Sequence, residues 1–245
     1  SRNELVATAL TRPLARMVEL TQQHRGLSSM VLGGNADMRD KRAQRAEEVS
    51  RALASLRASL AEDKRQLPAW QQIERDWQVL QAQGLQLERA ANFHAHTELV
   101  AQLLRLQIQL ADAYGLSFDP DEASFYLMTA AINRLPFLLE RFGRLRAQGS
   151  GALAQGHADS AQRIALSVLN EEIRSAMLDV EAGLAKVAEQ RPELRLSLEQ
   201  AVAALYQKIQ RVEQVVQGML LHEDFQSTSA AQFFELTTEG ITIGY

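Results

Sequence analysis

The octet from Gln22 to Ser29 holds the residues of this chain whose types and spacing best suit a chemical task. It combines Arg25, Gly26 and two serines inside a segment whose apolar spacing predicts a helix. A glycine within a helix costs about 1 kcal/mol relative to alanine, and a close approach of another group to the backbone would explain it. Arginine offers a planar fork of donors that suits small anions and carboxylates. The octet therefore predicts a binding site for a small anionic ligand.

The helical stripe that contains Arg25 is apolar at both ends and polar in the middle. Its members are Val18, Gln22, Arg25, Ser29 and Leu32. This pattern is typical of a helix that lines a small polar pocket inside a bundle. The alternative is that Arg25 lies at the surface, as most charged residues do, and that Gly26 only allows close helix packing.

A second group of polar side chains follows residues 119–122, whose acids and proline are explained as the capped first turn of a helix. Beyond that turn come Tyr126, Thr129, Asn133 and Arg134. The first three form one line on a helix, and they could face a ligand or make hydrogen bonds between helices. The acidic turn lacks the alternating oxygen ligands of an EF-hand, so calcium binding is not expected.

The histidines do not indicate a metal or haem site. His94 and His96 are two residues apart, so on a helix they point to different sides. We expect the histidines of this chain to be solvated or singly hydrogen-bonded. The sequence contains no phosphate-binding glycine loop, no nucleophile elbow and no di-iron Glu-x-x-His pair. We therefore expect no enzyme activity, no metal and no cofactor.

Composition is that of a globular helical protein. The chain has 245 residues, 46% of them hydrophobic and 23% charged, with a net charge of −4 and no cysteine. Disulfides and thiolate metal sites are thus excluded. No basic block is present, so nucleic acid is not an expected partner. No apolar run approaches the roughly 20 residues of a membrane span. Because the sequence starts with Ser1 inside an amphipathic pattern, we expect it to be a piece of a longer protein.

Apolar residues recur at spacings of three and four along most of the chain, which predicts an all-α fold. Glycine and proline breaks divide this pattern into helices expected at residues 2–32, 37–66, 69–114, 120–148, 158–190, 193–222 and 229–244. The third helix could bend near Gly84, and a glycine-rich turn is expected over 149–156. These lengths favour an elongated bundle, with two four-helix bundles that are stacked end to end and share long helices. A solenoid ranks lower because no repeat of fixed period is found.

Three stretches of the sequence resemble a known family. The first helix carries Gln22-x-x-Arg25-Gly26-x-Ser28, followed by residues 32–35. Residues 119–128 and 133–136 form the second stretch, and residues 233–241 form the third. In this order they resemble the nitrate- and nitrite-sensing (NIT) domains. They are also similar to related helical periplasmic input regions of bacterial methyl-accepting chemotaxis proteins, sensor histidine kinases and diguanylate cyclases.

This resemblance implies an extracytoplasmic sensor domain, held in the periplasm between two transmembrane helices of an inner-membrane receptor. In NIT domains a first-helix arginine helps to hold the anion, which implies that role for Arg25. His24 stands where those domains often have glutamate. We expect a small solute, an anion or carboxylate, to bind between helices. The expected ligand-binding residues are Gln22, Arg25, Ser29, Tyr126, Asn133 and Arg134.

Ligand binding would favour one packing of the bundle, and a small helix shift would pass to the membrane spans. A homodimer is expected, as is usual for such receptors. The alternative hypothesis is a protein-interaction, dimerisation or spacer module of a membrane receptor without a small-molecule ligand.

Overall fold

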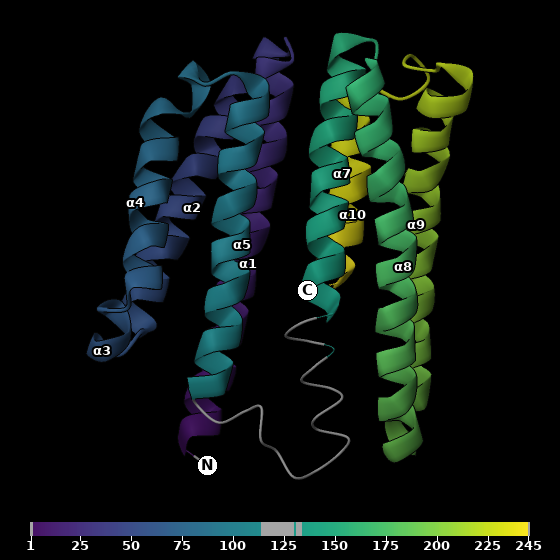
Figure 1. The fold of residues 1–245 in the computed structure, drawn as a ribbon. Coiled ribbons are helices and arrows are strands. Elements are labelled where there is room, and N and C mark those ends of the chain that lie inside the picture. The colour runs from purple at the N-terminus through teal and green to yellow at the C-terminus, as the bar shows by residue number, and fades with distance from the viewer. Residues whose placement is uncertain (1, 114–129, 131–133, 245) are drawn as a thin grey trace. The chain divides into compact units, whose positions relative to one another are not determined.

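The computed structural model describes residues 2–113, 130 and 134–244, and the side chains of residues 9–113, 130 and 134–241. Nine α-helices and no strand lie in this part of the chain, which confirms the predicted all-α fold. The chain divides into two compact units, Ser1–Leu116 and Ser117–Tyr245. Each unit is a four-helix bundle (Figure 1).

The first unit contains α1 (Arg2–Leu32), α2 (Arg39–Ser59), the short α3 (Glu62–Arg65), α4 (Pro68–Gln83) and α5 (Arg89–Ala113). Helix α1 packs against α2 and α5, and α4 packs against α5. Hydrogen bonds between side chains connect α4 back to α2: Trp77 Nε1 donates to Ser50 Oγ over 3.0 Å, and Arg57 pairs with Glu74. These contacts close a ring of four helices.

The second unit contains α7 (Leu135–Gln155), α8 (Ser160–Gln190), α9 (Arg195–His222) and α10 (Ala230–Gly244). Helix α7 packs against α8 and α10, and α9 packs against the same two helices. Asp159 caps α8 in a capping box: its side chain accepts from the backbone N–H of Gln162, whose side chain accepts from the Asp159 backbone. We predicted bundles that share long helices, but no described helix belongs to both units.

Two predicted helices are broken by extended residues. The helix expected over 37–66 ends at Ser59, because Leu60 has extended backbone angles, and α3 follows. The helix expected over 69–114 is two helices. A 3₁₀ turn at Gly84–Gln86 and the extended Leu87 separate α4 from α5, which turns back along it. The suspected bend near Gly84 is therefore a complete reversal.

The predicted glycine-rich turn over 149–156 was wrong for all but its last residue. Helix α7 continues through Gly149 to Gln155 and ends at Gly156, whose φ of 75° is the left-handed conformation of a helix cap. Gly149 has a packing role: a Cβ there would lie 2.4 Å from Cε1 of Phe233 in α10. The glycine allows the two helices to approach closely.

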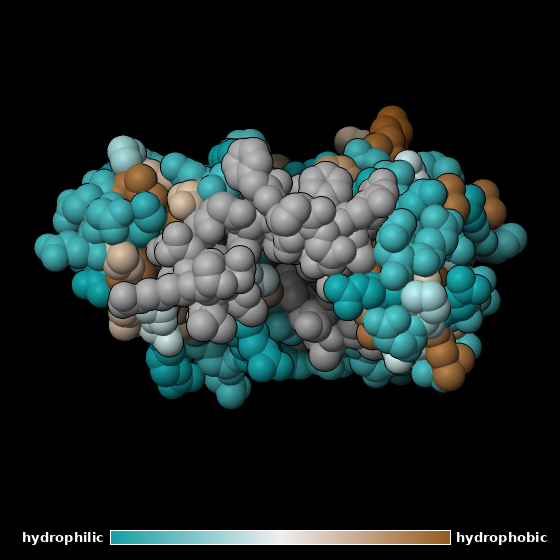
Figure 2. All heavy atoms as spheres, turned by 90° about the horizontal axis from the view of Figure 1, so that it is seen from below, coloured by the Kyte–Doolittle hydropathy of each residue, from teal (hydrophilic) through white to brown (hydrophobic). Residues whose placement is uncertain are grey.

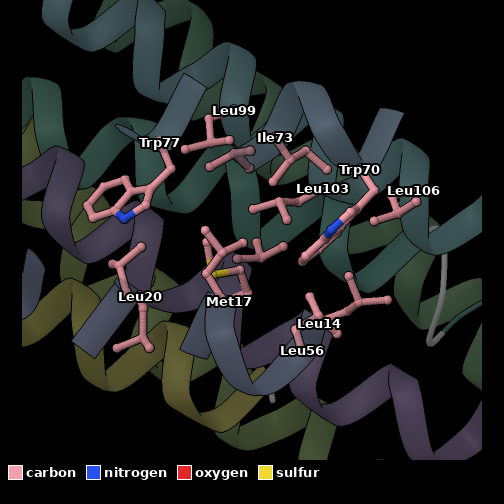
Figure 3. Packing of buried hydrophobic residues seen from close by; sticks show 14 of the residues in the cluster. Leu14, Met17, Leu20, Leu56, Trp70, Ile73, Trp77, Leu99, Leu103 and Leu106 are labelled. Carbon is pink, nitrogen blue, oxygen red and sulfur yellow. The ribbon is translucent and has the colours of Figure 1, made fainter. Parts of the chain in front are cut away.

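The apolar core of the first unit is built around two tryptophans of α4 (Figure 3). Trp70 and Trp77 are fully buried, and their spacing of seven places them on one face of α4. Met17 and Leu14 of α1 and Leu103 of α5 lie in the same cluster. Burial of a large side chain stabilises the fold by roughly 1.5–3 kcal/mol, so this cluster anchors the helices that carry the candidate site.

Candidate functional site

The polar octet lies in a segment of α1 that has no exposed face. Every residue from 17 to 31 is buried. A helix that is buried on all sides is usually apolar all round, yet this one carries glutamine, histidine, arginine and serine side chains. Burying a polar group costs free energy unless the group is hydrogen-bonded. The fold therefore has to supply partners for this segment, and most of them come from α5 and α2.

Arg25 is fully buried, with 0% of its surface exposed. Its Nη1 donates a hydrogen bond to Thr97 Oγ1 of α5 over 3.0 Å. Its guanidinium carbon lies 5.2 Å from the centroid of the Phe93 ring, also on α5. This places a planar cation against an aromatic face and a neutral hydroxyl, a setting in which its charge is only weakly screened by water.

The other predicted site residues have different outcomes. Gln22 and Ser29 are buried on the same helix as Arg25. Tyr126 and Asn133 lie outside the described residues. Arg134 belongs to the second unit, where its Nη1 donates to the carbonyl oxygen of Asp179 over 3.3 Å. Of the six predicted residues, the structure thus groups the three of α1.

A histidine pair that the sequence did not indicate lies beside Arg25. His24 Nδ1 and His96 Nε2 are 2.7 Å apart, and His96 Nδ1 is 2.8 Å from the carbonyl oxygen of Asn92. A carbonyl only accepts, so His96 Nδ1 donates to it and, in the neutral ring, His96 Nε2 accepts. His24 Nδ1 must then donate to His96. Both rings are fully buried. His24 makes one hydrogen bond, as the sequence analysis allowed, whereas His96 makes two, which departs from the expectation of solvated or singly hydrogen-bonded histidines.

Burial keeps both rings neutral. It lowers the pKa of His24 well below the usual value of 6.5, and the nearby charges of His96, Arg42 and Arg45 lower it further. It also lowers the pKa of His96 to about 3; the hydrogen bond to Asn92 opposes this shift, while Arg25 and Arg42 add to it. Two neutral imidazoles thus lie among arginines. By contrast, His94 is exposed on the opposite side of α5, as its spacing from His96 predicted.

Arg42 of α2 is the second cation of this region. It is 8% exposed, and its Nε donates to Ser28 Oγ over 2.7 Å. Asn92 lies on its other side: the Asn92 Nδ2 donates to the carbonyl oxygen of Gly84 over 2.8 Å. Sequence reasoning missed Arg42 and Asn92 because each is an isolated polar residue in an otherwise ordinary helical pattern.

Among the described residues of the second unit, one comparable buried cation is found. Arg146 of α7 is fully buried, its Nη1 donates to Thr238 Oγ1 over 2.9 Å, and its guanidinium carbon lies 4.6 Å from the ring centroid of Phe234. Both partners belong to α10. Within the residues described, no three metal-binding side chains gather into a possible metal site. None of the described helices has an apolar stretch that would cross a bilayer.

Comparison with known proteins supports the family suggested by the sequence. The model of the family described as nitrate and nitrite sensing matches residues 16–242, which is nearly the whole chain. No curated protein and no solved structure matches the chain significantly. The matched region includes Arg25 and the buried part of α1. The function that describes the family is sensing and not catalysis. This chain belongs to the family of nitrate- and nitrite-sensing domains.

Proposed function

We propose that the chain is the extracytoplasmic ligand-sensing domain of a bacterial transmembrane receptor and that it binds a small anion at Arg25. The observation that carries this proposal is a fully buried guanidinium that donates to a neutral hydroxyl and lies against an aromatic ring. Nitrate and nitrite are the first ligands to test because the family is described by them. Gln22 and Ser29 are the neighbouring groups on α1 that would complete the site.

Tyr126, Asn133 and Arg134 stay proposed ligand-binding residues. A bound anion would favour one arrangement of the helices over another in proportion to its differential affinity for the two. Such a shift could pass to transmembrane helices that flank the domain in the full-length receptor. We expect the receptor to be a homodimer.

The experiment measures thermal unfolding with a panel of anions and small carboxylates. A ligand at 100 times its dissociation constant adds about 2.7 kcal/mol to the stability of the protein. We expect nitrate, nitrite or another small anion to produce this gain in the wild type and not in Arg25→Gln. Arg12→Gln is the matched control, since Arg12 lies exposed on the same helix. An anion that stabilises wild type and Arg25→Gln equally would show that Arg25 is not the site.

A second candidate function is a dimerisation or interaction module, and one surface feature favours it. Helix α8 exposes Ile164, Val168 and Leu178, at 65%, 51% and 60% of their surface. Their spacings place them on one stripe of the helix, as in a coiled-coil seam. On the face seen in Figure 2, the rest of the surface is mostly hydrophilic with separate apolar patches. If this function holds, Val168→Glu abolishes self-association and no anion stabilises the domain.

A further inference from the structure

Arg42 is a buried cation that lacks a carboxylate partner among the residues described. With a described residue it makes one hydrogen bond, from Nε to the neutral hydroxyl of Ser28. Its Nη2 is buried and has no acceptor among those residues. A guanidinium keeps its charge at any ordinary pH, and an uncompensated buried charge is strongly unfavourable. Arg42 therefore needs an acceptor, preferably a negatively charged one, that the described part of its unit does not provide.

Two buried acceptors near Arg42 also lack partners. His24 Nε2 has no hydrogen bond, and neither has the side-chain oxygen of Asn92. Since His24 Nδ1 donates to His96, its Nε2 carries a lone pair and can only accept in the neutral ring. Asn92 uses its amide nitrogen on Gly84, so its oxygen is left as an acceptor.

The side chains of Arg42, His24 and Asn92 are neighbours. A Cβ placed on Gly84 would lie 3.2 Å from Arg42 Nη2 and 3.3 Å from Asn92 Nδ2, so both side chains meet beside that glycine. Ser28, which Arg42 contacts, is one helical turn from His24 on α1. Asn92 is one turn from His96 on α5 and accepts from it.

Charged and titratable groups around His24 come from three helices. Arg42 and Arg45 approach from α2, His96 from α5, and Arg25 is its neighbour in α1. From α4 the ring of Trp77 lies edge-on to His24, with the centroids 5.1 Å apart. Arg42 acts on both rings, Arg45 on His24 and Arg25 on His96. These positive charges add to the effect of burial in keeping the imidazoles neutral, and they would favour an anion there.

We propose that Arg42, His24 and Asn92 form a second binding site in the first unit and that it takes a small oxyanion which carries a hydroxyl group, such as bicarbonate. The anion would accept from Arg42 Nη2 and neutralise its charge. Its hydroxyl would donate to His24 Nε2 or to the Asn92 oxygen. This pattern of one charge, one donor and two acceptors is not complementary to an anion that can only accept.

The proposed site is distinct from that at Arg25. Successive residues of a helix point about 100° apart, so His24 and Arg25 leave α1 in different directions. The same offset separates His96 from Thr97, which are their respective partners on α5. The two sites therefore lie on different sides of the contact between α1 and α5, and each has its own arginine.

Nitrate and bicarbonate make a matched pair of probes, because both are planar monoanions of similar size and only bicarbonate has a hydrogen to donate. Thermal unfolding would be followed at mildly alkaline pH with each salt, at constant ionic strength. In wild type and in Arg25→Gln, we expect a saturable rise of Tm with bicarbonate. In Arg42→Gln the bicarbonate affinity falls by about tenfold or more, the usual effect of a lost charge-assisted hydrogen bond. His24→Phe should lose the preference for bicarbonate over nitrate.

Other outcomes overturn the inference and separate it from the proposed anion site at Arg25. If bicarbonate stabilises Arg42→Gln as much as wild type, Arg42 does not bind it, although Arg25 could still be an anion site. If nitrate stabilises Arg25→Gln as well as bicarbonate does, the hydroxyl is not recognised. If bicarbonate has no effect, the site holds only water. Should Arg42→Gln fail to fold, the ¹⁵N resonance of the His24 ring in wild type decides: bicarbonate must shift it, and nitrate must not.

Discussion

Acidification is expected to destabilise this protein through its buried histidine pair. In the folded state the pKa of His96 is lowered to about 3, and that of His24 is also well below 6.5. In the unfolded chain both should titrate near the usual value of 6.5. Between these values the unfolded state binds protons that the folded state does not. The free energy of unfolding therefore falls as the pH falls through about 6.5, and the loss continues until the folded pKa is reached.

The magnitude follows from the two pKa values of His96. On lowering the pH from about 7 to about 5, this residue alone removes about 2 kcal/mol from the free energy of unfolding. The slope near pH 5 is about 1.3 kcal/mol per pH unit for His96. The pKa of His24 is shifted in the same direction by burial, so its contribution to the pH dependence has the same sign. A typical domain has only about 5–15 kcal/mol to lose.

The assay is urea unfolding followed by circular dichroism at several pH values. His96→Gln is expected to be less stable than wild type at neutral pH because it breaks the link to His24. Its stability should nevertheless fall less steeply with acidification, since one buried imidazole is gone. His94→Gln is the matched control, because His94 is an exposed histidine on the same helix. Equal slopes in wild type and His96→Gln would refute the reasoning.

Two further predictions concern packing. Gly149→Ala should destabilise the second unit by about 1–3 kcal/mol, the usual cost of overpacking, because its Cβ would lie 2.4 Å from the Phe233 ring. Chemical denaturation of the variant measures this cost. Adding Phe233→Leu should recover part of the lost stability. If it recovers none, the contact with Phe233 is not the cause of the cost. Trp77→Phe should cost about 1 kcal/mol more than Trp70→Phe, because Trp77 Nε1 donates to Ser50 whereas Trp70 Nε1 has no partner. The same measurement would contradict this prediction if the two costs were equal.

The sequence predicted much of the fold because long helices leave a regular apolar pattern. The start of α8 after Asp159 and the end of α1 before Gly33 follow from local capping chemistry. Two other features of the helices do not follow from the local sequence. Leu60 ends α2 although leucine is a good helix former, and Gly149 continues α7 although glycine is a poor one. In the second case the close approach of Phe233 outweighs helix propensity, and this contact depends on residues more than 80 positions away.

The candidate site was predictable only in part. The octet of α1 was predictable as a candidate site because its glycine, arginine and serines interrupt an apolar stripe. His24 lies on a different stripe of α1 from Arg25, and its partner His96 is 72 residues away in the sequence. Arg42 forms no motif with any neighbour in sequence. Such groups become recognisable as a site only when the fold shows that they are buried and which of their atoms lack partners.

Helix α1 has two buried parts within the first unit, one mainly apolar and one mainly polar. Its residues from Leu10 to Leu20 contribute to the apolar cluster around the two tryptophans. Over the next turns, from Thr21 to Ser29, buried polar side chains outnumber apolar ones. Apolar contacts stabilise the first part without any ligand, whereas the second part buries the guanidinium of Arg25, to which we propose that an anion binds. A helix that is anchored by apolar contacts at one end and carries a buried cation at the other suits the proposed sensor, because an anion bound there would act on that end of the helix.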